Sequence, residues 1–581
     1  IVYLSVTSVV GEKKDDRIRR MMFKTAQLGN LIYPADPREV TVEVWSTKPL
    51  PEEDRKTTLV VRDYWGAEQG KPVPVALERK GKNKEMFVYE GKADLSAIPM
   101  ETGRYYEVHG FIERKDKEPF TNYTSLAILP EAPANQYKPG QVPFTSRNWD
   151  NRITEYIKLT NRLGIRICGI WGKMNADPKK VEAPQLDLVE KLGMGYLTGS
   201  PAHDVEQRAD GWQDLLANDG EKLRQGVRNY FEKFGKTKPA IVNLGNEPHS
   251  KGEDVKADVE AYRIVYEEIK KIDPSILVVG TSVGPKEDSD YAKYGYGKWC
   301  DAYDFHVYED ALSVRKNVEE KYPEMFKKFG DPKPVWSTEL GLNSQGMARQ
   351  FVAAELFRKT VNFFAGGGAS MSWFGLLYPD AEGKSHDSFG SAHNVFDCRY
   401  NRYAPKLDAI AYYNMVNAMG IKKFVEDKTF GDGTHAFLFR DRDGRALQVW
   451  YRDKGREDVF IPLPGVHAVR VIRIDGSVSE LDAGSKGLTL TVTEDPMLLL
   501  YEGGEKNLPA TPGEPRIRLG QVSGSLVRGE TGEFEVILGD TPADQVELKA
   551  PPFWKVERKP GKNTSGQPAL RFALQAPEDS A

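Results

Sequence analysis

Lys238–His249 reads KPAIVNLGNEPH, and this stretch decides the fold. Within it, Ala240–Leu244 is a short apolar run between a proline and a glycine, the profile of a buried parallel strand. Glu247 follows three residues after that run. A carboxylate is therefore expected at the carboxyl end of a strand, where barrels of alternating strands and helices gather their functional side chains.

A second carboxylate has the same placement further along the chain. Pro334–Leu340 reads PVWSTEL, another short apolar run after a proline, and it closes on Glu339. Glycoside cleavage requires two such groups, because one carboxyl protonates the leaving oxygen while the other attacks the sugar or activates water.

Working outward, strand-like and helix-like segments alternate, which is typical of a parallel α/β architecture. Seven segments have a strand profile: 165–171, 194–198, 240–244, 276–281, 303–307, 334–340 and 370–374. Gln141–Thr145 is the candidate for an eighth, and if it comes first, Glu247 follows the fourth strand and Glu339 the seventh. The fold class predicted for residues 136–421 is therefore α/β, a (β/α)8 TIM barrel.

The flanking regions have β character. Residues 1–135 carry β-branched residues at strand spacing between breaks rich in Pro, Gly and Asp, and we expect an N-terminal β-sandwich. Residues 422–505 predict a C-terminal β-sandwich. Residues 506–581 predict a further accessory β domain, and we expect that domain to be incomplete.

Composition narrows the class of partner. The 81 basic and 85 acidic residues give a formal charge of -4, so no global field selects nucleic acid or an anionic membrane. No apolar stretch is long enough for a spanning helix. The three cysteines form neither a disulfide framework nor a metal-binding spacing. We expect a neutral partner, with no cofactor and no metal.

The first residues bear on localisation. Ile1–Val10 is apolar but lacks a basic region and a cleavage site, so we interpret it as a strand. We expect a secreted or periplasmic protein whose export signal lies outside this sequence.

Taken together, these motifs resemble the glycoside hydrolases of clan A, which are retaining enzymes on (β/α)8 barrels, with family 39 and family 5 as the two nearest types. The resemblance covers roughly residues 141–420. It rests on Asn246-Glu247-Pro248, which resembles the acid/base site, and on Glu339, which resembles the nucleophile. Supporting matches are Arg166, His306, Tyr308, Trp373 and the run Asn394–Tyr413.

The resemblance implies a role for each glutamate, and physical chemistry says what each role needs. Glu247 must be protonated, which a poorly solvated site beside a second carboxylate favours. Glu339 must stay ionised, and we expect the Arg166 guanidinium and the Tyr308 hydroxyl to favour that state.

Other side chains are candidates for binding sugar. Asn246 can direct its amide at the 2-hydroxyl of the sugar. Trp373 is expected as the floor under the sugar, with plain core packing as the alternative. His203 and Trp171, at the rim, line a subsite or serve only in packing. His306 is either a site residue or a satisfied core histidine.

The predicted function is hydrolysis of β-glycosidic bonds in an oligo- or polysaccharide by double displacement. Two alternatives stay open: a transglycosylase, and a non-catalytic carbohydrate-binding or surface protein on a decayed barrel. A retaining mechanism predicts carboxyl groups about 5 to 5.5 Å apart, and an inverting one a separation nearer 9 Å.

Overall fold

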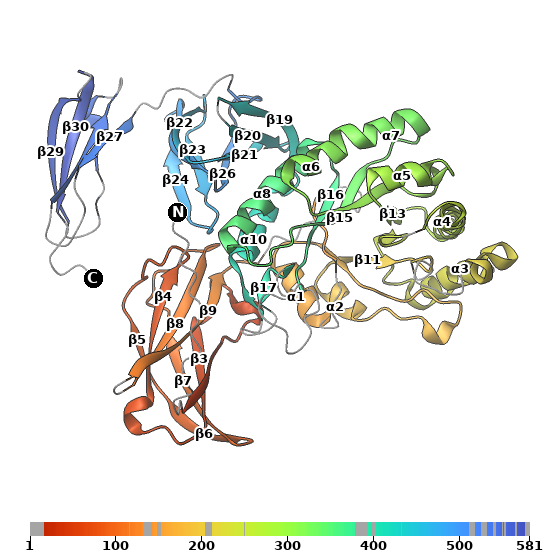
Figure 1. Ribbon diagram of the computed structural model, residues 1–581, viewed down its shortest axis with the longest axis horizontal. Coiled ribbons are helices and arrows are strands. Elements are labelled where there is room, and N and C mark those ends of the chain that lie inside the picture. The colour runs from red at the N-terminus through yellow and green to blue at the C-terminus, as the bar shows by residue number, and fades with distance from the viewer. Residues whose placement is uncertain are drawn as a thin grey trace. The chain divides into compact units, whose positions relative to one another are not determined.

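The computed structural model (Figure 1) divides the chain into two compact units. One contains the residues up to Ile421 together with Ile474–Val478, and the other contains Lys422–Arg473 and the residues from Ser479 onward. The structure describes residues 17–114, 117–131, 142–147, 153–203, 212–248, 250–377, 393–397, 403–431, 433–509, 517–523, 531–538, 542–548, 550, 554–563 and 566–575. The predicted strand at Ile1–Val10 and residue Gln141 lie outside these ranges.

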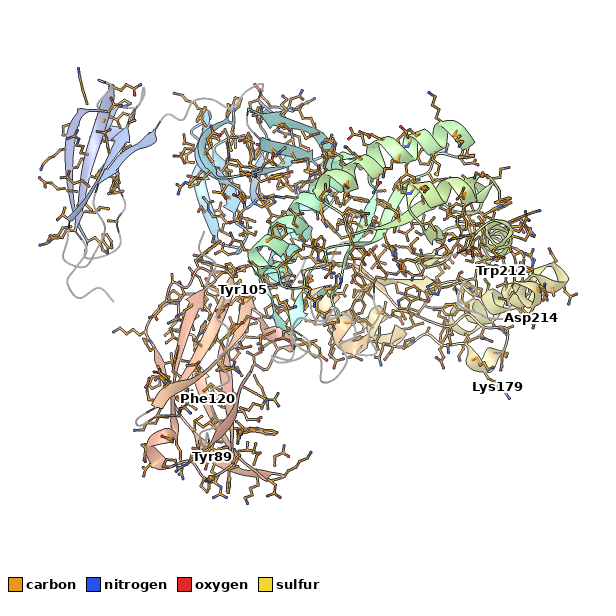
Figure 2. The ribbon with its side chains drawn as sticks, viewed as in Figure 1. Tyr89, Tyr105, Phe120, Lys179, Trp212 and Asp214 are labelled. Atoms are coloured by element: carbon orange, nitrogen blue, oxygen red, sulfur yellow. The ribbon has the colours of Figure 1, made fainter. Side chains whose placement is uncertain are left out.

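The first unit begins with two sheets that share one hydrophobic core. One sheet has the order β1-β3-β7-β6 and the other β2-β9-β8-β4-β5. Their bounds are β1 Ile18–Lys24, β2 Leu31–Ile32, β3 Glu39–Ser46, β4 Lys56–Asp63, β5 Val73–Ala76, β6 Glu78–Asn83, β7 Met86–Asp94, β8 Tyr105–Arg114 and β9 Lys117–Ile128. Alternate residues such as Val40, Val42 and Val44 of β3 point into the core, where Tyr89 is fully buried (Figure 2).

A seven-stranded parallel sheet follows, in the order β10-β11-β12-β13-β14-β15-β16. The strands are β10 Ile167–Gly169, β11 Gly195–Gly199, β12 Ile241–Asn243, β13 Leu277–Ser282, β14 Ala302–Val307, β15 Val335–Gly341 and β16 Ser370–Phe374. Each corresponds to one of the seven predicted segments, so the α/β class with a parallel sheet is confirmed. All residues of β12, β15 and β16 are buried, as expected for strands covered on both faces.

Helices follow the strands along the chain and lie around them (Figure 1). Their bounds are α1 Ile153–Arg162, α2 Leu186–Lys191, α3 Gln213–Phe234, α4 Glu253–Ile272, α5 Pro285–Ala292, α6 Ala311–Lys316, α7 Tyr322–Phe329, α8 Arg349–Ala365 and α10 Leu407–Met419. In α4 the residues at helical spacing, including Val255, Val259 and Tyr262, are buried, because this apolar stripe faces the rest of the unit.

Residues 142–147 contact both edge strands of the parallel sheet. Phe144 forms a parallel β-bridge with Met371 of β16, and Ser146 forms one with Cys168 of β10. The Thr145 amide donates to the Met371 carbonyl at 2.9 Å. This segment therefore lies between the first and the last strand of the sheet, at the position predicted for an eighth strand. A short antiparallel pair, β17 Phe396–Asp397 and β18 Ala404–Pro405, comes before α10.

The second unit is formed by β-strands. One sheet has the order β19-β20-β21-β26-β23-β24, and β22 pairs with β25 over the same hydrophobic core. The last sheet has the order β27-β28-β30-β29 and its own small core. The bounds are β19 Lys423–Phe430, β20 Thr434–Arg440, β21 Arg445–Arg452, β22 Arg456–Pro462, β23 Ala468–Ile472, β24 Val478–Asp482, β25 Gly487–Thr493, β26 Met497–Glu502, β27 Arg518–Ser523, β28 Thr531–Ile537, β29 Lys555–Lys562 and β30 Pro568–Gln575. Among the described helices, none combines the length and the apolar character that crossing a membrane requires.

Candidate active site

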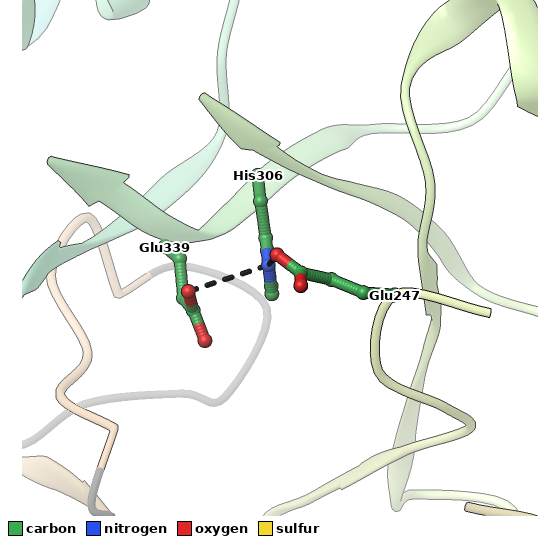
Figure 3. A group of neighbouring side chains, drawn as sticks. All are labelled: Glu247, His306 and Glu339. Atoms are coloured by element: carbon green, nitrogen blue, oxygen red, sulfur yellow. Dashed lines mark hydrogen bonds and ion pairs between the residues drawn. The ribbon is translucent and has the colours of Figure 1, made fainter. Parts of the chain in front are cut away.

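Three side chains from three parallel strands meet at the carboxyl end of the sheet (Figure 3). His306 of β14 and Glu339 of β15 are directly paired in the sheet register. Glu247 comes four residues after Asn243, the last residue of β12, and its backbone is left-handed with φ of 48°. The two predicted glutamates are therefore brought together, with an oxygen of one within 4.8 Å of an oxygen of the other.

Glu339 is the buried member of the pair, at 5% exposure. The Tyr308 hydroxyl donates to its Oε2 at 2.6 Å, and Nη1 of Arg147 donates to its Oε1 at 3.3 Å. Burial and the neighbouring Glu339 carboxylate both raise the pKa of Tyr308, so its hydroxyl keeps the proton that it donates. Glu339 thus has a hydrogen-bond donor for each of its two oxygens.

Arg147 also fixes the tautomer of His306. Nη1 of Arg147 lies 2.7 Å from Nε2 of His306. Because a guanidinium only donates, Nε2 must be the acceptor and the ring proton must be on Nδ1. Nδ1 lies 2.7 Å from Oε1 of Glu247, so His306 donates to this carboxyl group.

Glu247 is more accessible to solvent than the sequence suggested. Its side chain is 50% exposed, whereas that of Glu339 is 6% exposed. The expectation of a poorly solvated Glu247 is therefore wrong. The second part of the expectation, a nearby carboxylate, is met by Glu339.

Arg147 is the residue that sequence reasoning missed. It is buried, and it donates to Thr338 Oγ1 at 2.9 Å and to Asn243 Oδ1 at 3.4 Å. Its guanidinium lies 5.0 Å from the centroid of the Trp171 ring. The sequence did contain a signal for Arg147. This residue comes two positions after the candidate strand Gln141–Thr145, just as Glu247 comes shortly after its own strand.

Arg166, which the sequence assigned to this role, lies elsewhere. It directly precedes β10, and its carbonyl accepts from the Gly195 amide at the start of β11. Its guanidinium donates to Asn161 of α1. Arg166 is therefore at the amino end of the sheet, opposite the glutamates, and Arg147 takes its predicted place beside the buried carboxylate.

The aromatic side chain on β16 also needs a correction. The Phe374 ring lies 5.9 Å from the Tyr308 ring and 5.2 Å from the His393 ring. Trp373 is buried at 3% exposure, and its amide donates to the Tyr412 hydroxyl of α10. Because neighbouring residues of a strand point to opposite faces, Trp373 points away from the side chains that Phe374 contacts. Phe374 is the aromatic residue at the site, and Trp373 is core.

Two predicted rim residues contact each other and reach the site. The rings of Trp171 and His203 are 4.9 Å apart, and Trp171 stacks on Arg147. Asn246 forms a parallel bridge with Ser282 of β13. Its Oδ1 atom is buried and has no hydrogen-bond partner within the described residues. Trp171 and His203 are thus connected to the glutamates through Arg147, and Asn246 lies beside Glu247 in the chain.

A buried layer lies beneath these side chains. Asp304 of β14 is fully buried and accepts from the Thr338 amide at 2.8 Å and from the Thr338 hydroxyl at 2.6 Å. Burial raises the pKa of Asp304, while His306 and Arg147 act in the opposite direction. Asn243 donates to the Gly280 carbonyl at 2.8 Å. The two contacts with Asp304 fix Thr338, the residue that precedes Glu339.

Within the part of the chain that the structure describes, Glu247, His306 and Glu339 also lie close enough together to be considered as ligands of a metal ion. The donor set does not suit one in the observed arrangement. Nδ1 of His306 bears the proton directed at Glu247, so it presents no lone pair, and Arg147 already supplies the positive charge beside Glu339.

No protein family model and no curated protein matches the chain. Among solved structures, a family 39 glycoside hydrolase from the gut symbiont Bacteroides cellulosilyticus WH2 aligns with a TM-score of 0.59 and 15% identity, over 82% of this chain and 100% of that one. The chain has the fold of that family 39 enzyme. The resemblance to clan A is thereby confirmed for the fold.

Two further solved structures align with part of the chain. A glucosidase from Croceicoccus marinus has a TM-score of 0.46 and 12% identity, over 62% of this chain and 95% of that one. A family 39 β-xylosidase from Caulobacter crescentus has a TM-score of 0.42 and 15% identity, over 62% of this chain and 96% of that one.

Proposed function

We propose that this chain is a retaining glycoside hydrolase that cleaves β-glycosidic bonds of an oligo- or polysaccharide. The observation that carries the proposal is the pair of carboxylates with different environments: Glu339 is buried with two donors, and Glu247 is half exposed beside it. Their oxygens lie within 4.8 Å of each other. That proximity supports a retaining pair, whose carboxyl groups stand about 5 to 5.5 Å apart, over an inverting pair, whose carboxyl groups stand about 6.5 to 9.5 Å apart.

The fold supports the proposal. Seven parallel strands and the two parallel bridges of residues 142–147 are what a closed (β/α)8 barrel requires. In such a barrel, the carboxyl ends of all strands open to one face, which is where Arg147, Glu247, His306 and Glu339 gather.

In the proposed first step, Glu339 attacks the anomeric carbon while Glu247 gives its proton to the leaving glycosidic oxygen. This forms a covalent glycosyl-enzyme and releases the aglycone as an alcohol. Tyr308 and Arg147 donate hydrogen bonds to Glu339 and orient its carboxylate. The carboxylate of Glu339 disfavours a second negative charge nearby, which keeps Glu247 protonated.

In the second step Glu247, now ionised, takes a proton from water as that water attacks the anomeric carbon and releases Glu339. His306 donates to Oε1 of Glu247, so the transferable proton belongs on Oε2. The same residues would serve a transglycosylase, in which a sugar hydroxyl replaces the water. A non-catalytic carbohydrate-binding protein has no need of this matched pair.

Two variants separate the roles on a dinitrophenyl β-glycoside of the sugar found by screening aryl glycosides. The activated leaving group departs almost unaided. Glu247→Ala should therefore keep much of its first step, accumulate the covalent intermediate and react with azide to give a β-glycosyl azide. Glu339→Ala should lose the first step, and azide should give the product of inverted configuration.

Glu253→Ala, at the exposed start of α4, is the matched control and should retain wild-type rates. Exchanged behaviour of the two variants would exchange the roles of Glu247 and Glu339. Wild-type turnover of a confirmed natural substrate by both variants would show that this site is not a glycosidase centre.

A further inference from the structure

A buried ammonium group lies behind the site. Lys359 of α8 is fully buried. Its Nζ donates to the Gly341 carbonyl at 2.6 Å and to the Tyr308 carbonyl at 3.1 Å. Removing a cation from water is costly unless its donors are satisfied. The two carbonyls satisfy donors of Lys359, but the presence of a buried cation at this place still needs an explanation.

The two carbonyls belong to the ends of neighbouring strands. Gly341 is the last residue of β15, two residues after Glu339, and Tyr308 directly follows β14. Lys359 therefore links the two strands at the point where one presents the buried carboxylate and the other its phenol donor.

The space around Gly341 shows how closely the end of β15 packs against Tyr308. A Cβ atom at Gly341 would lie 2.9 Å from Cε1 of Tyr308 and 2.9 Å from the Phe374 carbonyl oxygen. The Tyr308 ring thus lies directly on the backbone of β15. Its hydroxyl reaches Oε2 of Glu339 at 2.6 Å, so a shift between the strand ends would change this contact.

The charges around Lys359 agree with a protonated group near neutral pH. Burial lowers the pKa of Lys359 to about 8, and the carboxylates of Glu355 on α8 and of Glu309 and Asp310 after β14 act in the opposite direction. Unfolding would return the pKa to its ordinary value of 10.5, so the folded state binds this proton less tightly than the unfolded chain. Carrying the charge therefore opposes folding at neutral pH, and an apolar side chain would serve packing better.

We propose that Lys359 is a positioning residue, an ammonium clamp that holds the ends of β14 and β15 so that Tyr308 stays in contact with Glu339. The inference rests on the proposed function, because it assigns Lys359 to the attack by Glu339. It predicts a loss in the nucleophilic step rather than in substrate binding.

The test measures attack by Glu339 directly. A fluorosugar inactivator with a dinitrophenyl leaving group, made in the sugar series that the wild type hydrolyses, traps the glycosyl-enzyme, and peptide mapping identifies the labelled residue. A displacement of about 1 Å costs about 100-fold in rate. Lys359→Met should accordingly lower the inactivation rate constant by about 10- to 100-fold, with the inactivator's binding constant within about 3-fold of wild type. Lys359→Gln, which keeps one donor group, should lie in between.

Arg358→Met is the matched control. It removes a cation from the same helix, one that pairs with Glu355 at 3.0 Å, and it should label at the wild-type rate. Equal labelling rates in wild type, Lys359→Met and Lys359→Gln would overturn the inference, and so would an equal loss in Arg358→Met. If Lys359→Met does not fold, Lys359→Gln decides alone. Failure of the proposed function has a different signature, since the wild type would then not be labelled at Glu339.

Discussion

Replacing Arg147 by methionine tests the arrangement of the site most directly. The variant removes the buried guanidinium that lies 3.3 Å from Glu339 and 2.7 Å from Nε2 of His306. Two unit charges about 4 Å apart attract by about 4 kcal/mol at an effective dielectric constant near 20. Breaking a buried pair costs about 3 to 5 kcal/mol, since one charge is left without its partner.

That cost converts into a rate. Each increase of about 1.4 kcal/mol in the activation free energy lowers the rate by a factor of ten. Because Tyr308 still donates to Glu339, we take the lower end, so Arg147→Met should lose about 100- to 1,000-fold in kcat/KM on the dinitrophenyl glycoside. Arg147→Lys keeps the charge but not the fork of donors, and it should recover only part of the loss.

The control is Arg166→Met, which removes a second buried arginine, from the amino end of the sheet. It should lower the melting temperature without changing kcat/KM at a temperature well below unfolding. Initial rates and thermal melts of all three variants are the assay. Wild-type kcat/KM in Arg147→Met, with a loss in Arg166→Met, would refute the reasoning and restore the arginine that sequence alone favoured.

Three further outcomes are expected. Phe374→Ala should raise KM or lower kcat, because this ring lies at the site. Trp373→Phe should lower the melting temperature and leave the kinetics close to wild type, because this side chain is in the core. The reverse pattern would show that Trp373 is the aromatic residue under the sugar. Burial lowers the pKa of His393 to about 4. The His393 side chain therefore stays neutral in the folded protein, whereas in the unfolded chain it binds a proton below about pH 6.5. Stability should therefore fall by up to about 3 kcal/mol from pH 7 to pH 4, and denaturant titrations should show a smaller fall in His393→Gln; equal pH dependence in both proteins would contradict this. Excess chelator should leave the rate unchanged, because Arg147 already supplies the positive charge beside Glu339, and a loss that added divalent metal restores would show otherwise.

Much of the fold could be predicted because its signals are local. Each parallel strand is an apolar run with a break on either side, and each long helix has an apolar stripe. The ends of the helices were harder to predict from the sequence. The stretch Val314–Phe329 has apolar residues at helical spacing with Pro323 among them, and the structure divides it into the end of α6, a π-helical segment at Asn317–Lys321, and α7 with this proline in its first turn. The turn tolerates proline because the first amides of a helix have no intrahelical partner.

The two misassigned site residues, Arg166 and Trp373, were each placed on a correctly predicted strand. The predicted strand Ile165–Trp171 contains Arg166, but the observed β10 is Ile167–Gly169, so a shift of two residues moves this arginine to the wrong end of the sheet. On β16 the predicted and observed bounds agree, and the error lies in the face: side chains alternate, so Trp373 and its neighbour Phe374 point to opposite sides of the sheet. Sequence patterns identify a strand more reliably than they identify its ends or its faces.

The residues that escaped sequence reasoning altogether are those whose meaning depends on a partner far along the chain. Arg147 meets Glu339 across 192 positions, and Lys359 meets the ends of two strands from a helix. Neither is marked by local pattern, since an arginine after an apolar run and a lysine in a helix are both ordinary. What distinguishes them is burial: both cations are buried, which is tolerable only when their donors are hydrogen-bonded in a fixed geometry, Arg147 to Glu339 and Lys359 to the carbonyls of Gly341 and Tyr308. The same condition makes the site useful for the proposed reaction, because dipoles and charges that are fixed in place before the sugar arrives need no reorganisation when charge develops on it.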